Sequence, residues 1–159
     1  FTRTTSAGRM RLRQVIRTDT TQRMVAIEMA LTNLGPGSIG SVILRRQIDL
    51  DVDTGGALGS GDFTNWFATT ERDSVFAWNA NNDHAREDHG VVMRHIGKSP
   101  GTPLHQPKVT SAILDNSCSP LNIAASNPVT GDYGATIQYN FGTMTAGRTL
   151  SARFQYERN

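Results

Sequence analysis

Three aspartates alternate along one stretch of the chain, at Asp49, Asp51 and Asp53. In an extended strand, residues two apart lie on the same face, so these carboxylates would converge on a hard cation such as calcium. The stretch departs from a helix–loop–helix calcium loop, because Thr54 and Ser60 stand where that loop needs glycine and glutamate. The row therefore predicts a calcium site of another kind.

The same aspartate row also has a metal-free interpretation, in which arginines of a neighbouring strand pair with it. The arginines concerned are Arg9, Arg11 and Arg13. On a larger scale, residues 1–23 hold six arginines and one aspartate (net +5), and residues 49–88 hold nine acids and two arginines (net −7). This separation favours contact between the two regions, within the fold or between subunits, over a nucleic-acid interface.

A second candidate site surrounds Trp66, in the polar segment Asp62-Phe63-Thr64-Asn65-Trp66. An indole ring offers a flat apolar surface on which the C–H face of a sugar can stack, and neighbouring carboxylate and amide groups bond its hydroxyls. We therefore expect Trp66, with Asp62 and Asn65 as polar partners, to bind carbohydrate. The alternative is that Trp66 caps the hydrophobic core, within which Trp78 is also expected.

Signatures of catalysis are largely absent. His84 and His89 are five residues apart, whereas a zinc-binding helical pair is spaced by four. The single cysteine, Cys118, excludes an intramolecular disulfide and a cysteine zinc cage. The sequence has neither a Gly-x-Ser-x-Gly elbow nor a Gly-x-x-x-x-Gly-Lys phosphate loop. We predict a protein that is not an enzyme, since a small hydrolase would need two suitable loop carboxylates near the tryptophan.

Alternation of apolar and polar residues with a period of two runs through much of the chain and predicts β-strands. It is clearest in residues 9–13, 25–31 and 42–52. Arg46 interrupts the apolar face of the third stretch, so we expect it at a bulge or beside a buried carboxylate. Shorter strands are expected at 75–78, 91–96 and 109–114, between or within irregular stretches at 54–73, 79–90 and 97–132.

Regular alternation returns in residues 135–141 and 150–156, and the turn between them predicts a hairpin. The composition, with 18 Thr and 15 Gly against four Glu and two Lys, disfavours helix, and residues 83–89 are the single short helical candidate. We predict one domain over residues 1–159 with an all-β fold. The expected fold class is an antiparallel β-sandwich, jelly-roll or immunoglobulin-like, of about 7–8 strands with long central loops.

Two stretches resemble parts of secreted sandwich domains. Residues 137–150, with Gly142-Thr143-Met144 and the turn Ala146-Gly147, resemble the closing hairpin of many extracellular sandwich domains. Leu31-Thr32-Asn33-Leu34-Gly35, followed by residues 42–49, is similar to a pattern in accessory domains attached to secreted bacterial hydrolases. The resemblance implies a non-catalytic protein that binds carbohydrate, calcium or a neighbouring module, outside the cell or on its surface.

Taken together, the sequence predicts a non-catalytic extracellular binding module with a polysaccharide or glycan as its partner and calcium as a candidate cofactor. The main alternative is a structural sandwich subunit that assembles with copies of itself, as a filament, shell or surface layer, through complementary charged faces. A small hydrolase is the second alternative. Nucleic acid is not an expected partner, and no apolar run is long enough to span a membrane.

Overall fold

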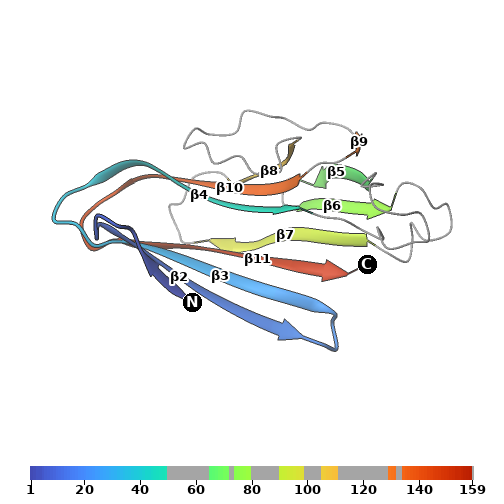
Figure 1. Cartoon of the computed structure of the whole chain (residues 1–159), viewed down its shortest axis with the longest axis horizontal. Helices are drawn as coiled ribbons and strands as arrows, with labels where there is room; N and C mark the ends of the chain where they lie inside the picture. Colours follow the sequence, from blue (N-terminus) through green and yellow to red (C-terminus); the bar gives the residue numbers. More distant parts are fainter. Residues whose placement is uncertain are drawn as a thin grey trace.

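The structure, a computed structural model, describes residues 1–49, 65–71, 74–79, 90–98, 105–110, 129–131 and 134–158. Side chains are described for residues 1–48, 74–75, 91–97 and 136–158. All regular structure in this part of the chain is β-strand, arranged as two antiparallel sheets that pack face to face (Figure 1). The predicted all-β antiparallel sandwich is therefore confirmed.

Over the described ranges, the larger sheet has eight strands and the smaller sheet has three. In spatial order, the larger sheet consists of β1 (Thr2–Thr4), β2 (Met10–Asp19), β3 (Met24–Asn33), β11 (Thr149–Arg158), β7 (Gly90–Lys98), β6 (Ser74–Asn79), β5 (Asn65–Glu71) and β9 (Val129–Gly131). The smaller sheet consists of β4 (Ile39–Asp49), β10 (Gly134–Met144) and β8 (His105–Thr110). The strands β1, β5 and β9 lie in segments that show no clear alternation in the sequence, which explains why these three were not predicted.

The hydrophobic core lies between the two sheets and follows the predicted alternation. On β3, Ile27 and Met29 are buried, and on β4, Val42 and Leu44 face them from the smaller sheet. The other buried apolar residues are Val75, Met93, Ile137, Tyr139, Phe141, Met144, Leu150, Ala152 and Phe154. Each sheet thus buries one face, as a sandwich requires.

The predicted C-terminal hairpin is wrong. β10 pairs with β4 and β8 in the smaller sheet, whereas β11 pairs with β3 and β7 in the larger sheet. The turn at residues 145–148 therefore carries the chain from one sheet to the other. Alternation with a short turn cannot distinguish these two connections, because both strands of such an arch also bury alternate residues.

Arg46 lies neither at a bulge nor, within the described residues, beside a carboxylate. The pairing of β4 with β10 continues without a shift through Arg46 and Ile137. The guanidinium instead crosses the core, donates a hydrogen bond of 2.7 Å to Tyr156 Oη, and lies 5.8 Å and 5.6 Å from the ring centres of Phe154 and Tyr156. Burial raises the pKa of Tyr156 above its ordinary value of 10.0, and the contact with Arg46 opposes that rise. Aromatic faces thus replace the expected counter-ion.

Asn33 holds one end of the sandwich together. Its side chain is fully buried, and Nδ2 donates to the carbonyls of Gly37 (2.8 Å) and Met144 (2.9 Å). Its Oδ1 accepts a bond of 2.9 Å from the backbone N–H of Gly35. A single buried amide thereby fixes the loop after β3 against the end of β10, which lies in the other sheet.

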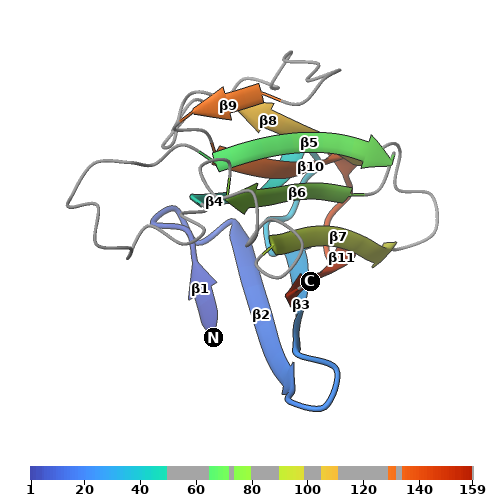
Figure 2. The same ribbon diagram turned by 90° about the vertical axis from the view of Figure 1, so that its right-hand side faces the viewer.

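At the opposite end, the β2–β3 hairpin extends away from the smaller sheet (Figures 1 and 2). Asp19 Oδ1 accepts hydrogen bonds from the backbone N–H groups of Thr21 and Gln22, which closes the turn, and Arg23 there has a φ of 51°. Ile16 of β2 pairs with the buried Ile27 on the inner side of the sheet but is itself 57% exposed. Among the described residues there is no helix that could cross a membrane.

Candidate functional site

The solvent side of the larger sheet is the surface on which polar and aromatic positions gather. We call it the outer face. It consists of the positions that alternate with the buried ones, so that the outer residues Glu28 and Arg153 lie directly opposite each other while Ile27 and Phe154 pair on the inner side. The described side chains of this face are, in strand order, Arg11, Arg13, Val15, Arg17, Asp19, Met24, Ala26, Glu28, Ala30, Thr32, Thr149, Ser151, Arg153, Gln155, Glu157, Val92, Arg94 and the buried Ser74.

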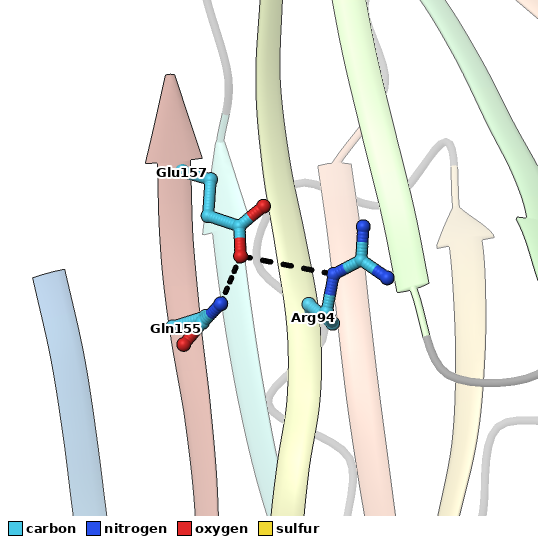
Figure 3. A network of polar contacts seen from close by, with 3 residues as sticks. All are labelled: Arg94, Gln155 and Glu157. Carbon is cyan, nitrogen blue, oxygen red and sulfur yellow. Dashed lines mark hydrogen bonds and ion pairs between the residues drawn. The ribbon is translucent and has the colours of Figure 1, made fainter. Parts of the chain in front are cut away.

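A polar cluster of Arg94, Gln155 and Glu157 occupies the middle of the outer face (Figure 3). Arg94 Nε lies 3.8 Å from Glu157 Oε1, and Gln155 Nε2 donates a hydrogen bond to the same oxygen. The side chains of Arg94 and Glu157 are 37% and 30% exposed. The cluster therefore presents a guanidinium, a carboxylate and an amide side by side on the outer face, where a polar ligand could contact them.

Arginines dominate the part of the outer face beyond this cluster. Arg11, Arg13 and Arg17 of β2 are exposed, and so is Arg153 of β11. A β-carbon at Gly97 would lie 3.1 Å from Arg153 Nη2, so the absence of a side chain there lets the guanidinium lie across β7. The strands between these arginines carry short side chains at Ala26, Ala30 and Ser151.

Aromatic residues occupy the other end of the outer face by register. Trp66 of β5 lies opposite Trp78 of β6, and Thr130 of β9 lies opposite Trp66 on the other side. Phe76 is two residues from Trp78 and pairs with Val92. These positions alternate with Val75, which is buried in the core, so the backbone register places both tryptophans on the outer face. The burial of the Trp78 side chain lies outside the described residues, so its expected place in the core stays a prediction.

The predicted carbohydrate-binding residues are described only in part. The backbones of Asn65 and Trp66 belong to β5, and their register is given, whereas Asp62 lies outside the described residues. Because neighbours in a strand alternate, Asn65 takes the register position of the inner side, at the first residue of β5. The assignment of these three residues to a ligand stays a prediction.

The predicted calcium row is also described only in part. Asp49 ends β4, and Asp51 and Asp53 lie outside the described residues. The arginine segment is not a sheet neighbour of β4, which holds the described part of this row, because β2 pairs with β1 and β3 in the larger sheet and β4 pairs with β10 in the smaller one. Within the residues described, no group of three or more His, Cys, Asp or Glu side chains is placed to hold a metal ion. The calcium site stays a prediction.

The polar cluster of Arg94, Gln155 and Glu157 was not predicted from the sequence. Its signal was present in the alternation of β11, where Arg153, Gln155 and Glu157 take every second position. What the sequence lacked was the neighbour of β11, because nothing in the chain indicates that β7 pairs with it and brings Arg94 beside Glu157.

Comparison with known proteins adds no assignment. No protein-family model matches the chain, and no curated protein is similar enough in sequence to match it. The function is therefore inferred from the residues of the outer face.

Proposed function

We propose that this protein is a non-catalytic module that binds a polysaccharide on the outer face of its larger sheet. The observation that carries the proposal is the register of Trp66 opposite Trp78, two residues along β6 from Phe76, whose row reaches the polar cluster. The row of Phe76 continues through Val92 to Glu157, and the row of Ser74 continues through Arg94 to Gln155. Aromatic and hydrogen-bonding positions therefore lie on one face, a few strands apart.

This combination suits a sugar chain for a chemical reason. A sugar ring has an apolar C–H face and a rim of hydroxyls that both donate and accept hydrogen bonds. Indole rings offer flat apolar surfaces with little conformational entropy to lose. The carboxylate of Glu157 accepts hydrogen bonds, the guanidinium of Arg94 donates them, and the amide of Gln155 does both. A sheet face also extends over several strands, about 4.8 Å apart, which matches an extended polymer better than a small ligand.

Substitution of the two tryptophans tests the proposal. Trp66→Ala and Trp78→Ala should each weaken retention on insoluble cellulose, xylan or chitin by about tenfold, because each removes one stacking surface. The matched control is Phe1→Ala, which deletes an aromatic side chain that is 73% exposed and lies off the outer face. Circular dichroism and thermal melting verify that each variant folds. Retention by both tryptophan variants equal to that of Phe1→Ala would contradict the proposal.

A second candidate function, assembly with other protein chains, is favoured by the free edge of β2. Phe1 and Gln14 exchange two backbone hydrogen bonds, of 2.8 Å and 3.0 Å. Even-numbered residues of β2 therefore direct their N–H and C=O groups toward β1, and β1 does not extend as far as Ile16 and Thr18. Both residues are exposed, so their backbone groups are available to an added strand.

Light scattering after size-exclusion chromatography tests this second function. Ile16→Pro removes the N–H that faces the free edge but leaves the bonds to β3, since those come from odd-numbered residues. If the edge mediates assembly, the wild-type protein and Ile16→Val form oligomers and Ile16→Pro is a monomer. A wild-type protein that stays monomeric at low and high salt, with and without calcium, argues against assembly.

A further inference from the structure

We infer that the polysaccharide bound by this protein is acidic, and that Arg11, Arg13, Arg17 and Arg153 bind its acid groups. This inference rests on the proposed function, since it assigns the charge of the same ligand. The side chains of these four arginines are described, whereas the tryptophans are placed by backbone register alone. The four arginines lie on the outer face in two groups, three on β2 and one on β11, with β3 between these strands.

The four guanidinium groups are exposed and carry an excess of positive charge. Among the described residues, none of the four makes an ion pair or a side-chain hydrogen bond. Arg94 differs, because Glu157 already lies beside it. Glu28 pairs in register with Arg153 and is the carboxylate that stands among the four arginines. Asp19, two residues beyond Arg17, takes the next outer position of β2, so the four positive charges exceed the negative charges of Glu28 and Asp19 by two.

The spacing of these arginines fits acid groups distributed along an extended polymer. Arg11 and Arg13 are two residues apart on one strand, about 7 Å, and Arg13 and Arg17 are four residues apart, about 14 Å. Arg153 lies two strands from β2, about 10 Å across the sheet. A guanidinium donates two parallel hydrogen bonds to a carboxylate or a sulfate, so each of these positions suits one acid group.

Nucleic acid is the other polyanion to consider, and the outer face suits it less well. A duplex carries one negative charge for about every 1.7 Å of its axis. Such a dense array of phosphates would also face Glu28, which lies among the arginines, and Glu157, which lies between them and the aromatic end. A polysaccharide carries its acid groups at wider intervals and presents hydroxyls between them. These hydroxyls can donate hydrogen bonds to a carboxylate.

The experiment compares one sugar backbone with and without its charge. Polygalacturonate and its methyl ester are titrated into the wild-type protein, the double variant Arg13→Gln/Arg17→Gln and the control Arg148→Gln/Arg158→Gln. The control removes the same charge from exposed arginines outside the set of four. We expect the wild type to bind the acid form about tenfold more tightly than the ester, since each surface ion pair contributes modestly. The double variant should lose this preference, and the control should keep it.

The salt dependence and the source of the acid group are measured in the same titrations. The preference for the acid form should decrease as sodium chloride increases, because salt screens exposed charges. Dextran sulfate against dextran distinguishes sulfate from carboxylate as the preferred group, and a charge preference in either pair supports the inference. Equal affinity for the charged and uncharged members of both pairs overturns it. So does an equal loss in the control variant, or tighter binding of duplex DNA through the same arginines.

Failure of this inference is distinguishable from failure of the proposed function. One outcome supports the polysaccharide site but excludes an acidic ligand. In it, the uncharged polysaccharides bind, Trp66→Ala weakens their binding, and the arginine variant does not change the preference for the acid form. If no polysaccharide of either kind binds to the folded wild-type protein, both proposals fail.

Discussion

Along β3 and β11, the inner and outer faces of the larger sheet differ in what their side chains do. On the inner face, Ile27 and Phe154 are 3% and 0% exposed and pack against the smaller sheet. The residues next to these, Glu28 after Ile27 and Arg153 before Phe154, lie on the outer face, and Arg153 is exposed. The same backbone therefore presents a hydrophobic core on one side and a charged surface on the other.

This difference between the two faces indicates that the inner face determines stability and the outer face is available for binding. Substitutions on the inner face remove packed apolar area, which is the main source of folding free energy. Substitutions on the outer face remove groups that contact mostly solvent in the free protein, so they should change binding with little effect on folding. Three predictions test this separation, in order of expected effect.

The largest effect is expected from Phe154→Ala. The ring is fully buried and lies beside Tyr156 and Arg46, so its loss leaves a cavity and should lower the free energy of unfolding by about 3 to 5 kcal/mol. The neighbouring Arg153→Ala should change it by less than about 1 kcal/mol. Urea unfolding followed by circular dichroism measures both. Similar losses in the two variants would show that the faces are not separated in this way.

The second prediction concerns a polar residue of the inner face. Asn33→Ala removes three hydrogen bonds and leaves buried backbone groups without partners, so it should destabilise the protein by about 2 to 3 kcal/mol. Asn140→Ala is the matched control, because that side chain is exposed and accepts one bond, from the N–H of Gly142. A loss in Asn33→Ala no larger than in the control would mean that apolar contacts alone hold that end of the sandwich.

The smallest effect is expected at Tyr156, where the inner face ends in a polar contact. The pKa of Tyr156 is raised in the folded state, so the unfolded chain loses this proton first as pH rises above 10.0. The stability from the neutral phenol is complete below pH 10 and is lost as pH rises through the folded-state pKa. At about pH 8, Tyr156→Phe should cost about 1 kcal/mol, because it removes the hydrogen bond from Arg46.

A comparison of the wild type with Tyr156→Phe measures the stability that the ionisation of Tyr156 removes at alkaline pH. Between about pH 8 and pH 11, the wild type should lose more stability than Tyr156→Phe, and the gap between them should shrink. The remaining titrating groups are shared by both proteins and cancel. Parallel unfolding free energies across this range would show that the phenol is not held in its neutral form.

Much of this fold was predictable from the residues, and the failures have identifiable physical causes. The alternation in residues 25–31 and 42–48 indicated which side chains are buried. The structure buries four of them, namely Ile27, Met29, Val42 and Leu44. The connection between β10 and β11 was predicted incorrectly, because a hairpin and an arch between sheets have the same local pattern. The partner of Arg46 was also missed, since Tyr156 is 110 residues away and belongs to the other sheet.

The candidate site was predictable to a smaller degree. The sequence identified Trp66 as a residue suited to a sugar but paired it with its neighbours in the chain. The register instead places Trp78 opposite Trp66. The neighbouring rows, which start at Phe76 and Ser74, lead to the cluster of Arg94, Gln155 and Glu157. Contacts across a sheet join residues that are distant in the chain, and local spacing carries no information about them.

The sequence by itself determined that the chain forms strands and which face of each strand is buried, because alternation and turn residues act over a few positions. Tertiary structure alone decided the order of the strands and therefore which outer residues are neighbours. That order places the arginines of β2 two strands from Arg153 and the aromatic positions of β5 and β6 at the other end. It follows from how two sheets bury their apolar faces together, a property of the whole chain rather than of any segment.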